Sequence, residues 1–171
     1  MRTGNNCARG EQALRYIAID LGDKRTGLAV GDSITRLVTP LNVIESPVAV
    51  REGEQLLADI ERAILEQVGP FTPAELVVGL PINMDGTEGQ RAKLVRSLAA
   101  RIAERTKRRV HFQDERLTSA EADWSMARSG MTHKDKKQRR DALAAAAILR
   151  DFLATLPGDG RSAIPGVGDD E

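Results

Sequence analysis

Three acidic positions in the sequence stand where a packed core would not place a charge. Two follow apolar runs of strand length and the third continues the apolar stripe of a helix: Asp20, the pair Asp114-Glu115, and Asp141. A buried carboxylate needs a cation or a hydrogen-bond donor in place of the water that it loses. Carboxylates that converge from separate elements would bind a hard divalent cation, Mg²⁺ or Mn²⁺, and such a site can activate water for phosphodiester hydrolysis.

Each of these acids also has an ordinary explanation. Asp is common in hairpin turns, and for Asp20 taken alone the turn explanation is the stronger one. The Asp114-Glu115 pair could be a solvated turn, and Asp141 could complement the helix dipole from the first turn of its helix. We favour one shared cation site because it accounts for all three positions at once.

Basic residues directly precede the last acid, and there are five of them: Lys134, Lys136, Lys137, Arg139 and Arg140. Such residues contact phosphates without reading base sequence, although a lone charge run is more often a solvated loop. The formal net charge of the 171-residue chain is zero, so any binding of nucleic acid must depend on a local patch of this kind.

The composition indicates a cytoplasmic protein with no membrane segment. The longest uninterrupted apolar run, Ala142–Leu149, is too short to span a bilayer, and the N-terminal segment lacks the apolar core of a secretory signal. Cys7 is the only cysteine, which fits a reducing compartment. Aromatic residues are few, which argues against a surface that stacks single-stranded bases.

Five strands and four helices are expected to position the acids. The strands are short apolar runs, and Pro40 places the third at a sheet edge or beside a bulge: Tyr16–Ile19, Gly27–Val30, Arg36–Ser46, Glu75–Leu80 and Val110–Gln113. The helices show apolar residues at helical spacing, and capping boxes (Thr87 with Gln90, Thr118 with Glu121) open the second and third: 51–68, 87–106, 118–128 and 138–153.

This order of elements predicts an α/β fold with a mixed five-stranded sheet flanked by helices. Three consecutive strands with short connections imply an antiparallel meander, and strands separated by helices imply two parallel additions. We expect one domain over residues 14–156, preceded by a flexible extension over 1–13. A tail rich in Pro, Gly and Asp, over 157–171, is expected to be disordered.

Four segments resemble, in order and spacing, the YqgF/RuvX family: IDLGDKRTGLAVGD, VVGLPINMDGTEG, VHFQDERLTSAEA and RRDALAAAAILRDFL. The likeness covers roughly Arg15 to Leu153. The family has a ribonuclease-H-like fold and is described as pre-16S rRNA nucleases and, earlier, as Holliday-junction resolvases. It implies a metal-dependent endonuclease that processes the 5′ end of pre-16S rRNA, within ribosomal precursor particles, or one that cuts four-way DNA junctions.

The resemblance implies a three-carboxylate centre on Asp20, Glu115 and Asp141. Asp114 stays open as the alternative to Glu115, because alternation along the strand does not decide which of the two faces the metal. Related resolvases carry a further acid one helical turn before the last one, and Gln138 stands at that place here. A fourth ligand is therefore missing, which also leaves a non-catalytic nucleic-acid-binding module as an alternative.

The resemblance also implies nucleic-acid contacts around this centre, for which turn-forming or cap-adjacent roles are about equally good explanations. The residues are Gly22, Lys24, Arg25, Asn83, Asp85, Gly86, Arg116, Lys136, Lys137 and Arg140. Symmetric nicking of a junction needs two active sites, and we expect a monomer or a weak homodimer. The Asp-Leu-Gly start also resembles the phosphate-binding hairpin of sugar-kinase and actin-like ATPases, which need two such domains where this chain has room for one.

Overall fold

The computed structural model describes residues 13–115 and 133–157, and for residues 133–139 it describes the helical backbone alone. Three α-helices, five strands and a short 3₁₀ helix make up this part of the chain. In order they are β1 (Arg15–Leu21), β2 (Thr26–Asp32), β3 (Val38–Ile44), η1 (Val50–Gly53), α1 (Glu54–Val68), β4 (Ala74–Leu80), α2 (Gln90–Thr106), β5 (Val110–Asp114) and α4 (His133–Thr155).

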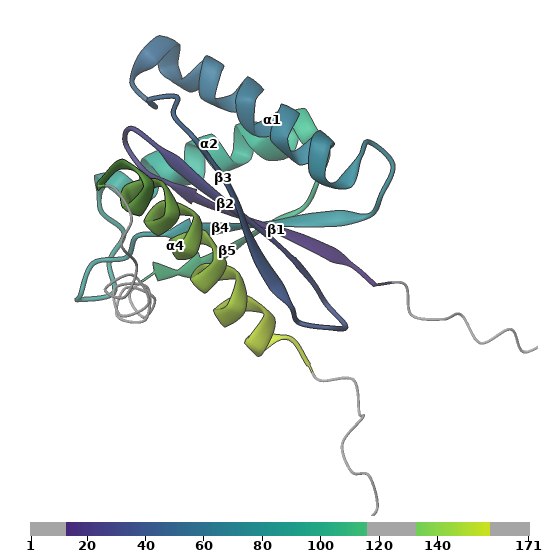
Figure 1. The fold of residues 1–171 in the computed structure, drawn as a ribbon. Coiled ribbons are helices and arrows are strands. Elements are labelled where there is room, and N and C mark those ends of the chain that lie inside the picture. Colours follow the sequence, from purple (N-terminus) through teal and green to yellow (C-terminus); the bar gives the residue numbers. More distant parts are fainter. Residues whose placement is uncertain (1–12, 116–132, 158–171) are drawn as a thin grey trace, which may run out of the picture.

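The five strands form one mixed sheet in the order β3-β2-β1-β4-β5, which confirms the predicted sheet (Figure 1). β1 pairs antiparallel with β2 and β2 with β3, while β1–β4 and β4–β5 are parallel. β3 is an edge strand, and the register of its pairing with β2 shifts between Gly27 and Ala29, beside the Pro40 pair. Proline cannot donate to the strand ladder, so both parts of the expectation for Pro40 are met.

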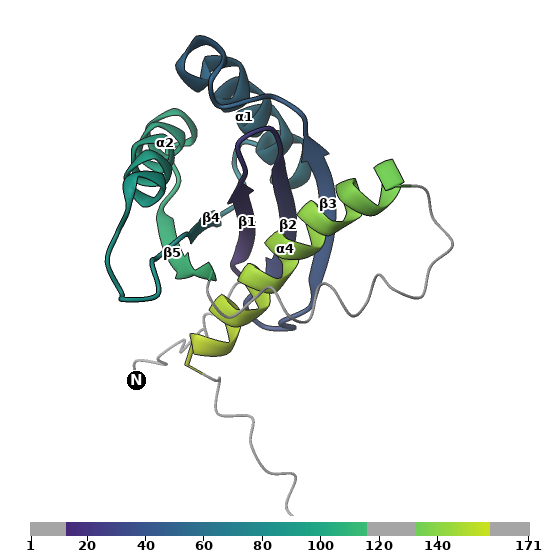
Figure 2. The ribbon, with the colours of Figure 1, turned by 90° about the vertical axis from the view of Figure 1, so that its left-hand side faces the viewer.

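Helices cover both faces of the sheet. α1 and α2 lie together on one face and α4 crosses the other, as the two views at right angles show (Figures 1 and 2). Alternate residues of β1 divide accordingly: Ile17 and Ile19 pack under α1 and α2, whereas Tyr16 and Ala18 pack under α4. By this alternation the side chain of Asp20 is on the α4 face.

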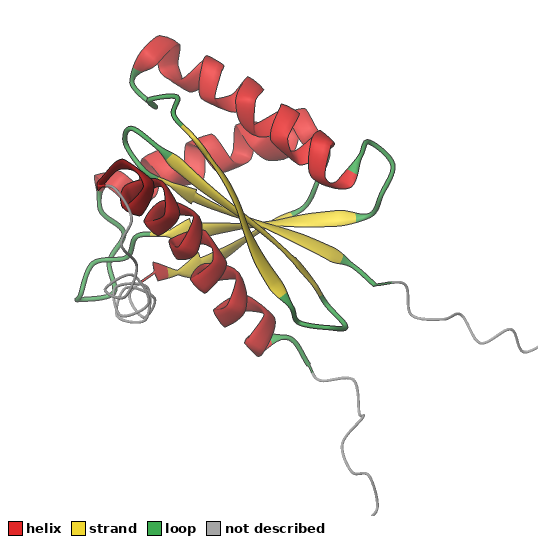
Figure 3. Cartoon of the chain, viewed as in Figure 1, coloured by secondary structure: helices red, strands yellow, loops and turns green. Residues whose placement is uncertain are grey.

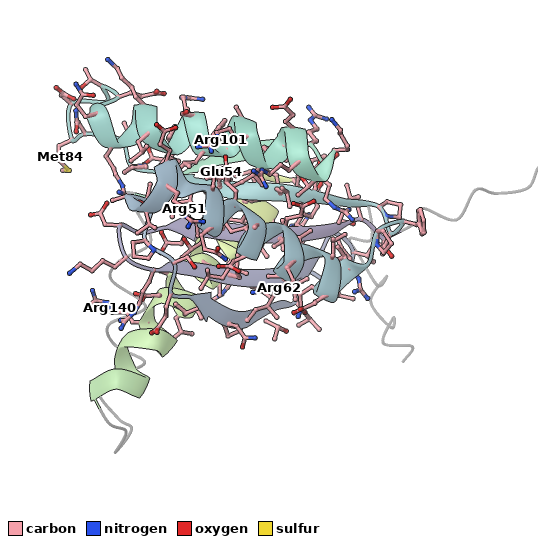
Figure 4. The ribbon with its side chains drawn as sticks, turned by 90° about the horizontal axis from the view of Figure 1, so that it is seen from above. Arg51, Glu54, Arg62, Met84, Arg101 and Arg140 are labelled. Carbon is pink, nitrogen blue, oxygen red and sulfur yellow. The ribbon has the colours of Figure 1, made fainter. Side chains whose placement is uncertain are left out.

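The helix α1 buries the stripe that its sequence predicts, with Leu56, Leu57, Ile60, Ile64 and Val68 all buried. It begins at Glu54 and not at residue 51, because the three residues before it, Arg51 to Gly53, have φ angles of 48°, 53° and 80°. Two side chains then join α1 to α2, since Glu54 forms ion pairs with Arg101 and Arg105 (Figure 4).

The capping box predicted for α2 is wrong. α2 begins at Gln90 after Gly89, and no side chain caps it. Thr87 instead takes part in the loop before the helix, where its backbone N–H donates to Asp85 Oδ1 at 2.9 Å and its Oγ1 accepts from Asn83 Nδ2 at 3.0 Å. The carboxylate of Asp85, two residues earlier, accepts from the backbone N–H and the hydroxyl group of Thr87. Thr87 is therefore held in a turn and does not cap α2.

The last helix is longer than predicted, because α4 begins at His133 and the basic segment before Asp141 is helical. Asp141 therefore lies well beyond the first turn, where complementing the helix dipole no longer explains it. The predicted helix over 118–128, the extension 1–12 and the tail from 158 lie outside the described residues. No helix within the described ranges has both the length and the apolar character that crossing a membrane requires.

Candidate carboxylate site

Asp20 lies between two glycines in one row across the sheet. Gly27 is its partner on β2, and the pairing of Ile19 with Val78 places Gly79 beside it on β4. Because β1, β4 and β5 run parallel, the carboxyl ends of all three meet at this edge. Figure 3 shows the β1–β2 turn, the loop after β4 and the beginning of α4 at the same end of the molecule.

The two glycines make room for the other two acids. A Cβ atom at Gly27 would overlap the backbone carbonyl oxygen of Asp141, so α4 can approach β2 only where the strand has no side chain. A Cβ atom at Gly79 would overlap Oε1 of Glu115 and come within 2.6 Å of Ile148 Cδ1. The row therefore brings Asp141 and Glu115 to either side of Asp20.

The carboxyl groups of Asp20 and Glu115 adjoin each other and interact through a side-chain hydrogen bond. Burial and, to a lesser extent, the negative charge of Asp141 together raise the pKa of Asp20 to about 6. Burial followed by the charge of Asp20 raises the pKa of Glu115 to about 7. Two carboxylates this close share a proton near neutral pH, and a cation is what would allow both to ionise.

Glu115 is thus the acid of the Asp114-Glu115 pair whose carboxylate meets Asp20. Asp114 ends β5, where it pairs with Leu80, and its charge is a minor cause of the raised pKa of Glu115. The side chain that turns toward Asp20 belongs to the residue just after the strand, where strand alternation no longer applies.

Asp141 is near Asp20 but is not part of the same hydrogen-bonded pair. Its Oδ2 is 4.0 Å from Arg25 Nη1, and Arg25 Nε is in turn 3.3 Å from Oε1 of Glu45. The Nη1 atom of Arg25 is buried and has no hydrogen-bond partner among the described residues. Arg25 therefore provides a buried donor on the side of the site that Asp141 faces.

No three His, Cys, Asp or Glu side chains form a ready metal-binding group in the part of the chain that the structure describes. What the structure contains is two adjoining carboxylates, Asp20 and Glu115, with a third acid, Asp141, close enough to raise the pKa of Asp20. This donor set, oxygen only and acidic, suits a hard divalent cation that takes one or two protein carboxylates and completes its shell with water and phosphate oxygens.

The residues expected to contact nucleic acid divide into those that the structure places and those that it does not. Lys24 and Arg25 are in the β1–β2 turn next to Asp20, and Arg140 is exposed one residue before Asp141 on α4 (Figure 4). Arg116 lies outside the described residues, and the side chains of Lys136, Lys137 and Gln138 are not described.

Other residues of that set have structural roles that account for their type. Gly22 closes the β1–β2 turn by donating to Arg25 O at 2.9 Å, and a Cβ atom there would overlap that oxygen. Asn83 and Asp85 form hydrogen bonds within the loop after β4, and Gly86 has a φ of 83°. The loop holds Met84 outward with 92% of its surface exposed (Figure 4).

The sequence reasoning missed Arg91, in the first turn of α2. Its guanidinium donates to the carbonyl oxygen of Leu21 and to the carboxylate of Asp23. Its positive charge also lowers the pKa of Asp20 and of Glu115, against the larger effect of burial. One signal could have revealed it, because a cation in the first turn opposes the helix dipole.

Comparisons with known proteins agree on one class. A family model described as RuvX, Holliday junction resolvase, matches residues 14–155. A protein of Anaeromyxobacter sp. (strain Fw109-5), named "Putative pre-16S rRNA nuclease", is 39% identical over 151 residues, which cover 88% of this chain and all of that protein. A protein of the same name from Thiobacillus denitrificans is 38% identical over 137 residues, 80% of this chain and 89% of the relative.

A solved structure shares the fold at much lower identity. RuvC of T. thermophilus, solved in complex with a Holliday junction substrate, aligns with a TM-score of 0.50 and 14% identity over 83% of this chain and 97% of its own. The fold is therefore RuvC-like, that is, ribonuclease-H-like, as the sequence predicts.

Fold, family model and relatives together define a nuclease, a hydrolase that acts on the phosphodiester bonds of nucleic acid. The chain belongs to the RuvX family. The predictions of family, fold and enzyme class are thereby confirmed.

Proposed function

We propose that this nuclease is a metal-dependent endonuclease that processes the 5′ end of pre-16S rRNA during ribosome biogenesis, in the cytoplasm. The observation that carries the proposal is the contact between Asp20 and Glu115 at the carboxyl ends of parallel strands, with Asp141 above the neighbouring Gly27. The names of the relatives, which cover most of their own length and of this chain, support the substrate.

In this proposal Asp20 and Glu115 would hold a Mg²⁺ or Mn²⁺ ion, with Asp141 of α4 as the third acid of the site. When bound, the ion supplies an activated water and stabilises the leaving oxygen of the phosphodiester. The pair must give up its shared proton for this, and the nearby guanidinium of Arg91 favours that loss because it lowers the pKa of both carboxyl groups. The glycines at 27 and 79 keep the space between the acids open.

Basic residues around the acids would orient the substrate by its phosphates. Lys24 and Arg25 would contact the nucleic-acid strand next to Asp20. Basic residues at the start of α4 would extend the contact: Lys136, Lys137 and Arg140. Arg116 and the loop that contains Asn83, Asp85 and Gly86 would border the same path. Contacts of this kind position a nucleic acid without specifying its sequence.

A second substrate, the four-way DNA junction, is favoured by the description of the family and by the fold shared with RuvC. Cutting both strands of a junction symmetrically requires two active sites, and so a dimer. We place the rRNA precursor first because the relatives at 38% and 39% identity carry that name, and we expect a monomer or a weak homodimer, within ribosomal precursor particles.

One experiment separates the two substrates. Purified wild type and Asp20→Asn are incubated with a pre-16S rRNA fragment and with a synthetic four-way junction, with and without Mn²⁺. We expect wild type to cleave the RNA only when Mn²⁺ is present. The rate per protein molecule should not depend on protein concentration. Cleavage of the junction in preference to the RNA, with a second-order dependence on protein concentration, would make resolution of junctions the function.

A further inference from the structure

Arg91 is a cation at the end of a helix that disfavours one. It is the second residue of α2, a helix that has no acid in its first turn and no side-chain cap. A positive charge there opposes the partial positive charge of the exposed backbone N–H groups. A residue that breaks a local rule of this kind calls for a contact elsewhere that compensates.

Within the described residues, the hydrogen bonds of Arg91 reach the segment that follows Asp20. Nη2 donates to the carbonyl oxygen of Leu21, the last residue of β1, and Nη1 donates to Oδ1 of Asp23 in the turn. These residues are 70 and 68 positions away in the chain. Arg91 thus ties the beginning of α2 to the end of the strand that carries Asp20.

The same turn is held from its other side. The backbone N–H of Val48 donates to the carbonyl oxygen of Asp23 at 3.2 Å, and Gly22 donates to Arg25 O across the turn at 2.9 Å. Among the described residues, the turn is therefore held by Val48 on one flank and by the two hydrogen bonds of Arg91 on the other.

We propose that Arg91 is a positioning residue of the nuclease site, which fixes the end of β1 through Leu21 and Asp23 and so holds the Asp20 carboxylate against Glu115. The inference rests on the proposed function of that site.

A purely structural role gives a different expectation. The carboxylate of Asp23 is 84% exposed, and exposed ion pairs contribute little to the stability of a folded protein. If Arg91 positions the site, loss of its guanidinium should therefore change the melting temperature little and lower the affinity for a cation strongly.

Four variants test the proposal. Arg91→Gln removes the charge, Arg91→Lys keeps it with fewer donors, and Asp23→Asn weakens one of the two contacts. Arg96→Gln is the matched control, because Arg96 is on the same helix, forms a two-point ion pair with Glu88 and lies over the ring of Phe112 at 4.5 Å, without a contact to the acids.

Three readouts apply to each variant: Mn²⁺ binding without substrate, amide hydrogen exchange over residues 21–26, and kcat and KM on the RNA fragment. For Arg91→Gln we expect Mn²⁺ affinity to fall about tenfold or more, exchange of the turn to become faster, and kcat to fall while KM changes by less than about threefold. Arg91→Lys should show a smaller change than Arg91→Gln in each readout, and Asp23→Asn should give values between those of these two variants. Arg96→Gln should match wild type.

Wild-type Mn²⁺ affinity and wild-type exchange in Arg91→Gln would overturn the proposal. So would a large fall in melting temperature that Arg91→Lys does not correct, since that would assign a structural role alone. If wild type cleaves no RNA, the proposed function fails, and Mn²⁺ binding and hydrogen exchange still decide the role of Arg91.

Discussion

The Asp20 carboxylate is costly to keep charged, because it is half-buried on the α4 face of the sheet and adjoins a second acid. With no cation present, it and Glu115 keep a proton between them, as their pKa values of about 6 and about 7 require. An ordinary protein would place an apolar side chain here. A cation in place of the proton would remove the repulsion between the two carboxylates, which is the physical reason for proposing one.

This coupling predicts a pH dependence of stability in metal-free protein. Both pKa values are raised above those of the unfolded chain, so the acids stabilise the fold while they are protonated, below about pH 4 to 5. That contribution is lost as the pH rises through about 6 to 7. In EDTA we expect the free energy of unfolding of wild type to fall by about 2 to 4 kcal/mol between pH 5 and pH 8, measured by urea denaturation.

The variants Asp20→Asn and Glu115→Gln should lose about half or more of this fall, because each removes one titrating carboxyl group and its contribution to the raised pKa of the other. Glu66→Gln, at an exposed position of α1, is the matched control and should behave as wild type. A fall of the same size in Asp20→Asn and in the control would show that the carboxylate pair does not cause it.

At the scale of elements, the site depends on how closely α4 lies over the sheet. The helix packs over small residues such as Ala18 and Ala29 as well as over larger ones, and at two glycines, Gly27 and Gly79, a Cβ atom would meet an acid of the site. The same lack of side chains that allows α4 to dock thus leaves the space in which the acids meet. Packing and function are joined in these glycines.

Gly79→Ala tests this joint role, with Gly31→Ala as the control. The new methyl group at 79 would displace the Glu115 carboxylate, whereas at 31 it would meet side-chain atoms of Leu149 and Leu153 at 3.0 and 3.2 Å. Overpacking should destabilise both variants by about 1 to 3 kcal/mol. Only Gly79→Ala should also lower kcat, by about tenfold or more, measured at a temperature where both variants are folded. Equal activity in the two would contradict the role of Gly79.

The elements themselves were largely predictable from the sequence, and their ends were not. Short apolar runs predict strands and apolar residues at helical spacing predict helices, so the order of elements along the chain, the mixed sheet and the buried stripe of α1 were predictable from local patterns. The start of α4 was misjudged because the basic residues before Asp141 show no apolar stripe, and Thr87 was misjudged because Asp85 competes for it. The second error comes from a side chain that can bind either of two local partners.

For the whole molecule, a net charge of zero means that no long-range field attracts a nucleic acid. Attraction must come from the one end of the molecule where the β1–β2 turn and the start of α4 lie together. In Figure 4 Arg140 lies at this end and Arg62 lies on α1, away from it. The two exposed arginines therefore form a matched pair.

Arg140→Gln should weaken binding of the RNA fragment and reduce the slope of log affinity against log salt concentration by about one. Arg62→Gln should leave both quantities unchanged, because Arg62 pairs with Asp59 at 2.8 Å on its own helix. Fluorescence anisotropy at several salt concentrations measures both. A slope that changes equally in the two variants would contradict a localised binding surface.

The parts of the site that the sequence could not reveal are those made by distant contacts. Asp20 was singled out by its place at a strand end, but the choice of Glu115 over Asp114 depends on which side chain turns toward Gly79 after the strand. Arg91 depends on contacts across about 70 positions of the chain. Local patterns contain no information on such contacts, so the fold had to supply it.

In the proposed mechanism Asp20, Glu115 and Asp141 act together on one phosphodiester. Single-turnover cleavage of the pre-16S rRNA fragment in Mn²⁺ measures this directly for Asp20→Asn, Glu115→Gln, Asp141→Asn and, as the control, Asp114→Asn. The first three should each be slower than wild type by about a hundredfold or more, and Asp114→Asn should stay within about threefold. Wild-type cleavage by any of the first three, or an equal loss in Asp114→Asn, would contradict the assignment of these three acids to the site.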